Sequence, residues 1–239
     1  MTPSPTSPER DPEPVIAIAH RGDPIDHREN TLPAFAAALA LGADMLELDL
    51  RRTRDGTIVV LHDQSLLRLW EHDASVGDLD VSDVARLGEG DTRIPTLRQL
   101  LDAVPADVDL MVDFTRREVV PGALDQALSA GALDRCLFVT GNVEALRMLR
   151  GLSGRARIGL TWTEGTDPPL PLLDKLGAEY WNPMFSSVTA AGVDAVHEAG
   201  LRVSTWTVDA PEDMERVVSD GVDAVVSNRV ADLVAFLGR

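Results

Sequence analysis

Two histidines and two carboxylates in the first quarter of the chain are the residue types that metal-assisted acid–base chemistry requires. His20 directly follows one apolar run, and His62 ends another. Glu47 and Asp49 lie between them, inside a third apolar run. Imidazole has an ordinary pKa of about 6.5, which suits proton transfer at neutral pH, and carboxylates bind hard divalent cations. The four residues therefore indicate a site that acts on a charged substrate.

Glu47 and Asp49 are two positions apart in a β-type run, so their side chains share one face of the strand. Two unit charges about 4 Å apart repel by about 4 kcal/mol at an effective dielectric constant of about 20. A bound cation, a raised pKa or an ion pair with an inward arginine would each relieve this repulsion. Asp113, near the end of a later run, adds a third carboxylate and favours the cation. The alternative for Asp113 is a strand-end residue that bonds to a neighbouring loop. Oxygen donors without clustered Cys or His indicate Mg²⁺ or Ca²⁺.

Arg21 and Gly22 follow His20 directly. Gly22 allows the backbone to turn sharply, and the forked guanidinium of Arg21 can hold a phosphate through two hydrogen bonds. Three tryptophans lie at or near the ends of expected strands, where they form either an aromatic wall of the pocket or packing near its rim: Trp162, Trp181 and Trp206.

Apolar β-type runs alternate with helical patterns through most of the chain, which indicates a parallel sheet covered by helices. Segment 51–57 is too short for a crossover helix, which needs about a dozen residues, and its Asp55-Gly56 pair favours a hairpin turn. Removing the returning run leaves eight parallel strands, so we predict a (β/α)8 TIM barrel with a β-hairpin extension after the second strand. The hairpin would return His62 to the barrel mouth. The expected strands are 15–19, 44–50, 58–61, 108–114, 136–140, 157–161, 178–182, 201–207 and 223–227.

Composition narrows the classes of partner. The chain has 239 residues and a formal net charge of −17, which argues against nucleic acid or stable membrane association, because both require a basic surface. Residues 1–14 are rich in Pro, Ser, Thr and Glu, and we expect a disordered tail rather than a signal peptide. Residues 15–239 are expected to form a single domain. These features predict a cytoplasmic protein with a small-molecule substrate, and they leave its oligomeric state open.

The chain resembles the glycerophosphodiester phosphodiesterase (GDPD) family of the phospholipase C-like phosphodiesterase superfamily. The resemblance covers almost the whole chain and keeps the motifs in order. These motifs are His-Arg-Gly at 20–22, Glu-Asn-Thr-Leu-Pro-Ala-Phe at 29–35, Glu-Leu-Asp at 47–49, Thr-Arg-Asp-Gly at 53–56, Leu-His-Asp at 61–63, Ile-Pro-Thr-Leu at 94–97, Trp-Thr-Val at 206–208 and Gly-Val-Asp-Ala-Val-Val-Ser-Asn at 221–228.

The resemblance implies a (β/α)8 barrel and the metal-dependent hydrolysis of glycerophosphodiesters to sn-glycerol 3-phosphate and an alcohol. In this pattern His20 and His62 are the acid–base pair. The glycerol 2-hydroxyl would attack phosphorus to give a cyclic phosphate, which water then opens. Glu47, Asp49 and Asp113 would bind the divalent cation, Mg²⁺ or Ca²⁺. The substrate would be bound by Arg21 and Trp206.

The sequence departs from the family pattern on the third barrel strand. The family usually has Glu-x-Lys there, whereas this chain has Asp113 and, two residues later, Thr115. Asp is one methylene shorter than Glu, and Thr lacks the positive charge, which Arg116 or Arg117 is a candidate to supply. Segment 68–90, where the family has a small insertion, also differs from the family pattern. Two alternatives therefore stay open: a phosphodiesterase of the same fold that acts on another headgroup, such as a lysophospholipid or a glycerophosphoinositol, and a non-catalytic degenerate member.

Overall fold

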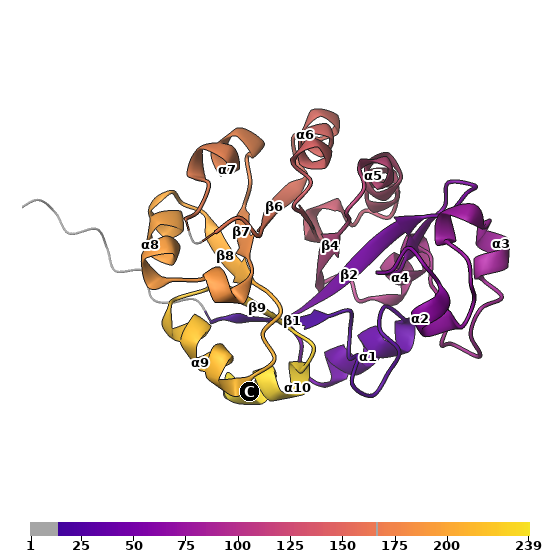
Figure 1. The fold of residues 1–239 in the computed structure, drawn as a ribbon, viewed down its shortest axis with the longest axis horizontal. Helices are drawn as coiled ribbons and strands as arrows, with labels where there is room; N and C mark the ends of the chain where they lie inside the picture. The colour runs from indigo at the N-terminus through magenta and orange to yellow at the C-terminus, as the bar shows by residue number, and fades with distance from the viewer. Residues whose placement is uncertain (1–13, 166) are drawn as a thin grey trace, which may run out of the picture.

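The computed structural model describes residues 14–165 and 167–239, so all but the last residue of the expected tail 1–14 lies outside the described range. Eight parallel strands in the described part of the chain form a closed barrel (Figure 1). It closes because β1 (Ile16–His20) pairs with both β2 (Met45–Arg52) and β9 (Ala224–Ser227). The remaining parallel strands are β4 (Asp109–Asp113), β5 (Cys136–Thr140), β6 (Arg157–Trp162), β7 (Tyr180–Pro183) and β8 (Arg202–Thr205).

Helices surround the barrel, as the alternating pattern predicts, and the (β/α)8 fold is confirmed (Figure 1). Thr31 caps the first helix with its side chain, and Thr96 forms a capping box with Gln99, which satisfies amide groups that lack partners at a helix start. The outer helices are α1 (Leu32–Ala40), α4 (Leu97–Ala103), α5 (Val120–Ser129), α6 (Val143–Leu152), α7 (Leu170–Leu176), α8 (Ala190–Glu198), α9 (Pro211–Ser219) and α10 (Val230–Phe236). Short 3₁₀ turns are η1 (Val76–Asp78), η2 (Arg117–Val119), η3 (Leu133–Arg135) and η4 (Phe185–Ser187).

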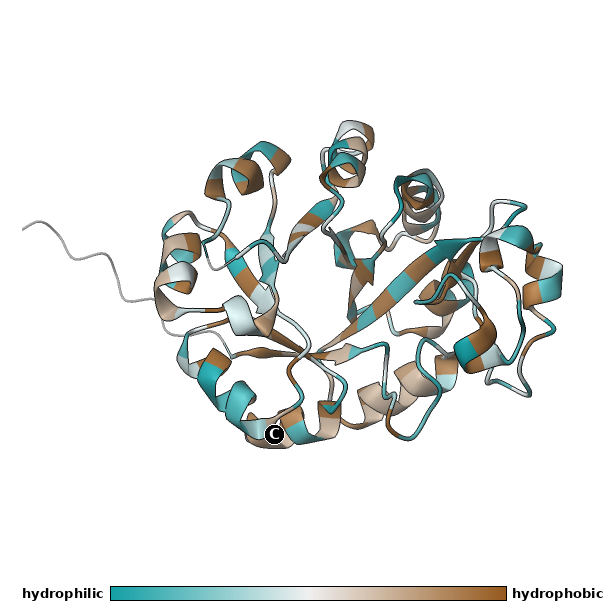
Figure 2. Ribbon diagram, viewed as in Figure 1, coloured by the Kyte–Doolittle hydropathy of each residue, from teal (hydrophilic) through white to brown (hydrophobic). Residues whose placement is uncertain are grey.

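Strand β2 shows how residue alternation builds the two sides of the barrel wall, and Figure 2 shows hydrophobic and hydrophilic bands alternating along it. Leu46, Leu48 and Leu50 are fully buried in the large apolar layer between strands and helices, where each such side chain contributes about 1.5–3 kcal/mol. Met45 belongs to a smaller apolar cluster that also holds Ile18, Met111 and Leu137. Glu47 and Asp49 follow Met45 on the same face, toward the carboxyl end of the strand.

The predicted hairpin is also present. Strand β3 (Ile58–Val60) runs antiparallel to β2, with Leu50 opposite Val60. Gly56 in the connecting turn has φ +91°, a conformation that glycine adopts without steric cost. Two short helices, α2 (Leu67–Trp70) and α3 (Val81–Val84), follow the hairpin, and a separate apolar cluster packs this extension together (Figure 1).

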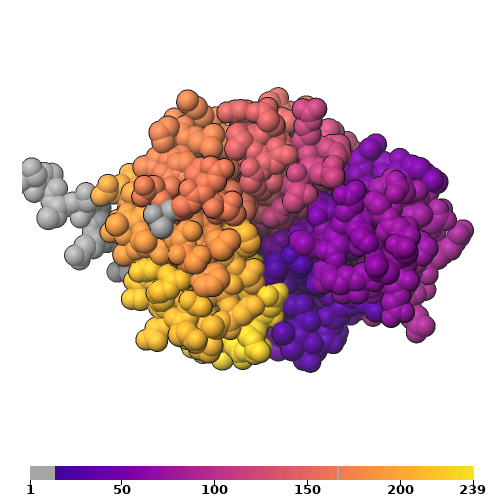
Figure 3. Space-filling model, in the orientation of Figure 1, coloured from indigo at the N-terminus to yellow at the C-terminus, as the bar shows by residue number. Residues whose placement is uncertain are grey.

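The two ends of the described chain lie next to each other. In the space-filling view the indigo N-terminal part meets the yellow C-terminal part, as the pairing of β1 with β9 requires (Figure 3). Loops that follow the first and last strands can therefore contribute to one site. No helix in the described ranges has the length and apolar character needed to span a bilayer.

Candidate active site

All seven residues that the sequence predicts as site residues line one pocket of about 240 Å³. The pocket lies at the carboxyl ends of the parallel strands, the end at which TIM-barrel enzymes place their chemistry. The hairpin brings His62 to this pocket, as expected from the turn in segment 51–57. The seven residues are His20, Arg21, Glu47, Asp49, His62, Asp113 and Trp206.

His20 ends β1 and is held from behind by an amide. Its Nδ1 lies 2.7 Å from Oδ1 of Asn228, and the amide nitrogen of Asn228 donates to Oδ2 of Asp209 at 2.8 Å. Because Asp209 takes the amide hydrogens, Asn228 presents its oxygen to His20, so Nδ1 of His20 carries a proton. Nε2 is then left to act as a base, and it lies 3.8 Å from Oε2 of Glu47. Burial, followed by the charge of Arg21, lowers the pKa of His20.

His62 follows β3 and is held by a carboxylate. Its Nδ1 lies 2.7 Å from Oδ1 of Asp63, and Oδ2 of Asp63 accepts a hydrogen bond from Nε of Arg68. Arg68 also donates to Glu29. The hydrogen bond from Arg68, together with that from His62, lowers the pKa of Asp63 to about 2. The two histidines of the pocket thus have chemically different partners, an amide for His20 and an ionised carboxylate for His62.

Arg21 lies among the carboxylates of the pocket. Its backbone has φ +60°, and its amide donates to Oε2 of Glu47 at 3.0 Å. Its guanidinium contacts Asp49 through Nε and Glu29 through Nη1, both at 3.0 Å. The inward arginine considered as an alternative for Asp49 is therefore present. Asp49 also accepts a hydrogen bond from the side-chain amide of Asn30 at 2.8 Å.

Two further carboxyl groups, the buried Glu47 and the half-buried Asp113, lie close to Asp49. Asp113 is paired with Asp49 across β2 and β4. Burial and the charge of Asp49 raise the pKa of Glu47 well above its usual value and that of Asp113 to about 7. The excess of buried negative charge and the oxygen donors fit a hard divalent cation in kind. In the described ranges, however, no three His, Cys, Asp or Glu side chains converge on a common metal position, and Arg21 contacts Asp49 instead.

The positive charge near Asp113 comes from a residue that the sequence did not single out. Nη1 of Arg51, on β2, donates to Oγ1 of Thr115 at 3.1 Å, and the charge of Arg51 counteracts the rise in the pKa of Asp113. Arg116, a candidate for this role, instead donates to Gln64 at 3.0 Å. Arg51 lies two residues beyond Asp49 on the same strand face, and this spacing is the signal that could have identified it.

Comparison with known proteins assigns the chain to a family. The model of the glycerophosphoryl diester phosphodiesterase family matches residues 20–232. The chain belongs to this family. The match includes the strand ends that carry both histidines and the three carboxylates.

Relatives match the GDPD chain over nearly their whole length. A glycerophosphodiester phosphodiesterase of Caldanaerobacter subterraneus subsp. tengcongensis is 29% identical over 94% of this chain and 98% of its own. A probable glycerophosphodiester phosphodiesterase 2 of Mycobacterium tuberculosis is 32% identical over 92% of this chain and 89% of its own.

Solved structures share the fold. A putative glycerophosphoryl diester phosphodiesterase from Silicibacter pomeroyi superposes with a TM-score of 0.86 at 24% identity, covering 95% of this chain and 94% of that one. A phosphodiesterase from Oleispira antarctica, solved in complex with the product sn-glycerol-3-phosphate, has a TM-score of 0.86 at 21% identity, with coverages of 94% and 97%.

The tryptophans of this GDPD member divide between pocket and core. Trp206 lines the pocket, and its indole nitrogen donates to the carbonyl oxygen of Asn182 at 3.0 Å. Trp181 is fully buried in the layer between strands and helices, because its neighbours Tyr180 and Asn182 take the inward positions of β7. Trp162 packs against the same layer. Of the three tryptophans, only Trp206 lines the described pocket, so the packing alternative describes Trp162 and Trp181.

Proposed function

We propose that this protein hydrolyses glycerophosphodiesters to sn-glycerol 3-phosphate and an alcohol, with the help of a divalent cation. The proposal rests on one observation: His20 and His62 share a pocket with three carboxylates, and each ring is held at Nδ1 by its own partner. Membership of the family and the names of the relatives support it. The product bound to the Oleispira antarctica enzyme agrees with the expected chemistry.

The different partners suggest different roles for the histidines. His20, neutral and with Nε2 free, would take the proton from the attacking 2-hydroxyl of the glycerol moiety. His62, held by the ionised carboxylate of Asp63, would donate a proton to the oxygen of the departing alcohol, because a carboxylate stabilises an imidazolium. The bond from phosphorus to the alcohol oxygen breaks as the bond to the 2-oxygen forms. The roles reverse when water opens the cyclic phosphate. Arg21 would orient the phosphate.

Members of the family are generally dependent on divalent metal ions. In this chain Glu47, Asp49 and Asp113 would hold the cation, Mg²⁺ or Ca²⁺. When bound, such a cation neutralises charge that develops on the phosphate. Because Arg21 contacts Asp49, a cation held by this carboxylate would compete with the guanidinium for it.

Single substitutions of the two histidines test the proposal. We expect His20→Ala and His62→Ala each to lower kcat by about 10²–10⁴-fold, the usual contribution of an acid–base group, with an unchanged circular dichroism spectrum. His197→Ala is the matched control, because His197 lies on the outer helix α8 and bonds to Asp223 at 2.9 Å. Full activity of either pocket variant would contradict the assignment. A wild-type protein that binds the cation without hydrolysing any diester would favour the non-catalytic alternative.

We infer that residues 15–239 act as one domain in the cytoplasm, on a small-molecule substrate. The net charge of −17 supports the absence of a nucleic-acid partner. A panel of glycerophosphocholine, glycerophosphoinositol and lysophospholipid would identify the preferred headgroup.

A further inference from the structure

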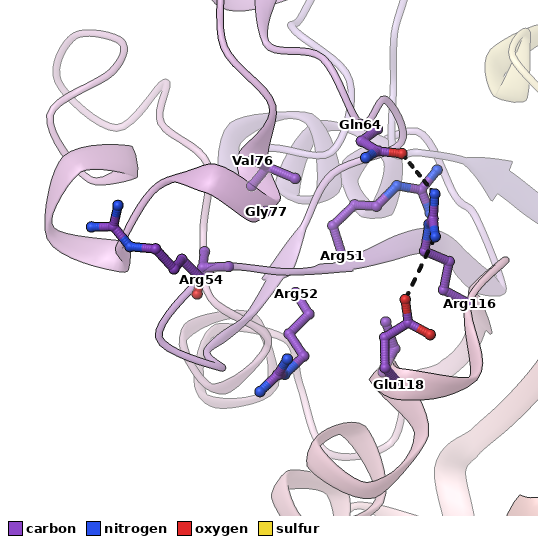
Figure 4. Close-up of a pocket in the computed structure, with 10 residues that line it drawn as sticks. Arg51, Arg52, Arg54, Gln64, Val76, Gly77, Arg116 and Glu118 are labelled. Carbon is purple, nitrogen blue, oxygen red and sulfur yellow. Dashed lines mark hydrogen bonds and ion pairs between the residues drawn. The ribbon is translucent and has the colours of Figure 1, made fainter.

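A second hollow of about 260 Å³ lies next to the active-site pocket and is rich in arginine (Figure 4). Among the residues that line it are four guanidinium groups, in a protein whose net charge is −17. Such a local concentration of positive charge attracts anions. The four residues are Arg51, Arg52, Arg54 and Arg116.

The hollow continues the active-site pocket. Three segments contribute residues to both spaces. On β2, Asp49 lines the pocket and Arg51, two residues later on the same face, lines the hollow. After β4, Thr115 lines the pocket and Arg116 the hollow. After β3, the general-acid candidate His62 lines the pocket, and Gln64 lines the hollow. The hollow therefore adjoins the side of the pocket from which the alcohol would leave.

Two of the four arginines, Arg52 and Arg54, do not point toward the active-site pocket. Arg54 makes two hydrogen bonds to the carboxylate of Asp80, at 2.9 and 2.7 Å, and Figure 4 shows Arg54 and Arg52 directed away from the other pair. They are therefore poorly placed to bind a ligand beside the pocket.

Arg51 and Arg116 have mostly neutral partners. Arg51 donates to the Leu50 carbonyl and to the hydroxyl of Thr115, and within the described ranges no carboxylate oxygen lies within 4 Å of its guanidinium. Arg116 donates to Gln64 at 3.0 Å, and its ion pair with Glu118 is long, at 3.7 Å. The charges of Asp49 and Asp113 attract Arg51 more strongly than the like charge of Arg116 repels it. An anion bound by both guanidinium groups would relieve this repulsion.

We propose that Arg51 and Arg116 form a subsite for an anionic group on the alcohol portion of the substrate. The inference rests on the proposed function, because it requires the departing alcohol to lie on the His62 side of the pocket. The preferred substrates are then glycerophosphodiesters whose alcohol carries a further phosphate or carboxylate. Both anions match the forked guanidinium.

Matched substrates test the subsite. Glycerophosphoglycerol is compared with the same diester bearing a terminal phosphate monoester, and with a counterpart bearing a carboxylate at that position. We expect wild-type kcat/KM to be roughly tenfold higher for at least one of the anionic substrates, mainly through KM, since one charge-assisted hydrogen bond contributes about that much. The relative rates of the two anionic substrates distinguish phosphate from carboxylate as the preferred group.

Arg116→Gln is the informative variant, because the side chain is exposed and the substitution removes only the charge. We expect it to bring the ratio of anionic to neutral kcat/KM close to one. Arg155→Gln changes the net charge equally, next to the start of β6 at the opposite end of the barrel, and should preserve the ratio.

Each outcome is decisive. Hydrolysis of all three substrates with equal kcat/KM, or an Arg116→Gln variant with the wild-type ratio, would overturn the subsite and leave the proposed function intact. If none is hydrolysed, the proposed function fails. The subsite is then judged by calorimetry with the phosphate-bearing diester, in which wild-type protein must bind at least several-fold more tightly than Arg116→Gln.

Discussion

The two pocket histidines differ in what holds them, and this difference is the basis of their proposed roles. His20 contacts the neutral side-chain amide of Asn228. The carboxylate of Asp209 orients Asn228 by accepting hydrogen bonds from both its side-chain amide and its backbone amide. His62 contacts the carboxylate of Asp63 directly. An amide partner fixes the tautomer without adding a charge next to the ring, so the half-buried His20 stays neutral and is ready to accept a proton.

Replacing the amide with a carboxylate tests this distinction. Asn228→Asp would place a negative charge at Nδ1 of His20 and favour the imidazolium, which raises the pKa of His20. Because His20 must be neutral to act as a base, the acidic limb of the kcat/KM pH profile should move to higher pH, by about one unit. Asn142→Asp, at the N-cap of α6, adds the same charge elsewhere on the rim and serves as control. A limb that stays in place or moves to lower pH would contradict the assignment.

The sequence identifies the seven pocket residues because each lies within or just after a recognisable strand or in a family motif. It gives no role to Asp209, or to Asn228 at the end of a family motif, because both approach His20 only when the last strand pairs with the first and closes the barrel. It also misses the contact of Arg51 with Thr115, which depends on the rotamers of a long side chain. The spacing from Asp49 places Arg51 on the pocket side of the strand, but it does not specify which group the side chain contacts.

At the scale of elements, the junction between β1 and α1 positions both His20 and Arg21. Gly22 has φ +85° and packs directly against the backbone of α1. A Cβ atom at residue 22 would lie 2.6 Å from the carbonyl carbon of Ala34. The Arg21 carbonyl also accepts a hydrogen bond from the amide of Asn30 at 2.9 Å. The turn is therefore fixed by close packing as well as by hydrogen bonding.

Gly22→Ala should be strongly destabilising for this reason. We expect it to lower the free energy of unfolding by about 2 kcal/mol or more, from positive-φ strain and the contact with the α1 backbone. Gly90→Ala is the matched control, since Gly90 also has positive φ, at +54°, but a Cβ there meets no atom within 4 Å. Urea unfolding of both variants measures the difference. If both variants lost the same free energy of unfolding, packing of residue 22 against α1 would not restrict this position.

The elements themselves are predicted well, because the strands follow apolar periodicity and the hairpin follows from a segment too short to cross the barrel. The expected strand 201–207 is longer than the observed β8, Arg202–Thr205. Trp206 leaves the regular strand, and its side chain faces the pocket. Periodicity alone also places Trp181 at the rim, but it cannot tell which face of β7 points inward.

At the scale of the whole molecule, charge is distributed unevenly. The chain is strongly acidic overall, yet the active-site mouth and the adjacent hollow include Arg21, Arg51 and Arg116. The buried carboxylates of the pocket would repel a phosphodiester unless a cation were bound. We therefore expect catalysis to depend on a divalent metal ion, with the arginines supplying the remaining positive charge.

Product analysis with glycerophosphocholine tests the proposed metal-dependent hydrolysis. Protein treated with a chelator is assayed before and after addition of Mg²⁺ or Ca²⁺, and choline, sn-glycerol 3-phosphate, phosphocholine and inorganic phosphate are measured. We predict equal amounts of choline and sn-glycerol 3-phosphate, and only when the cation is restored. Release of phosphocholine in their place, or an equal rate in the presence of excess chelator, would contradict the account.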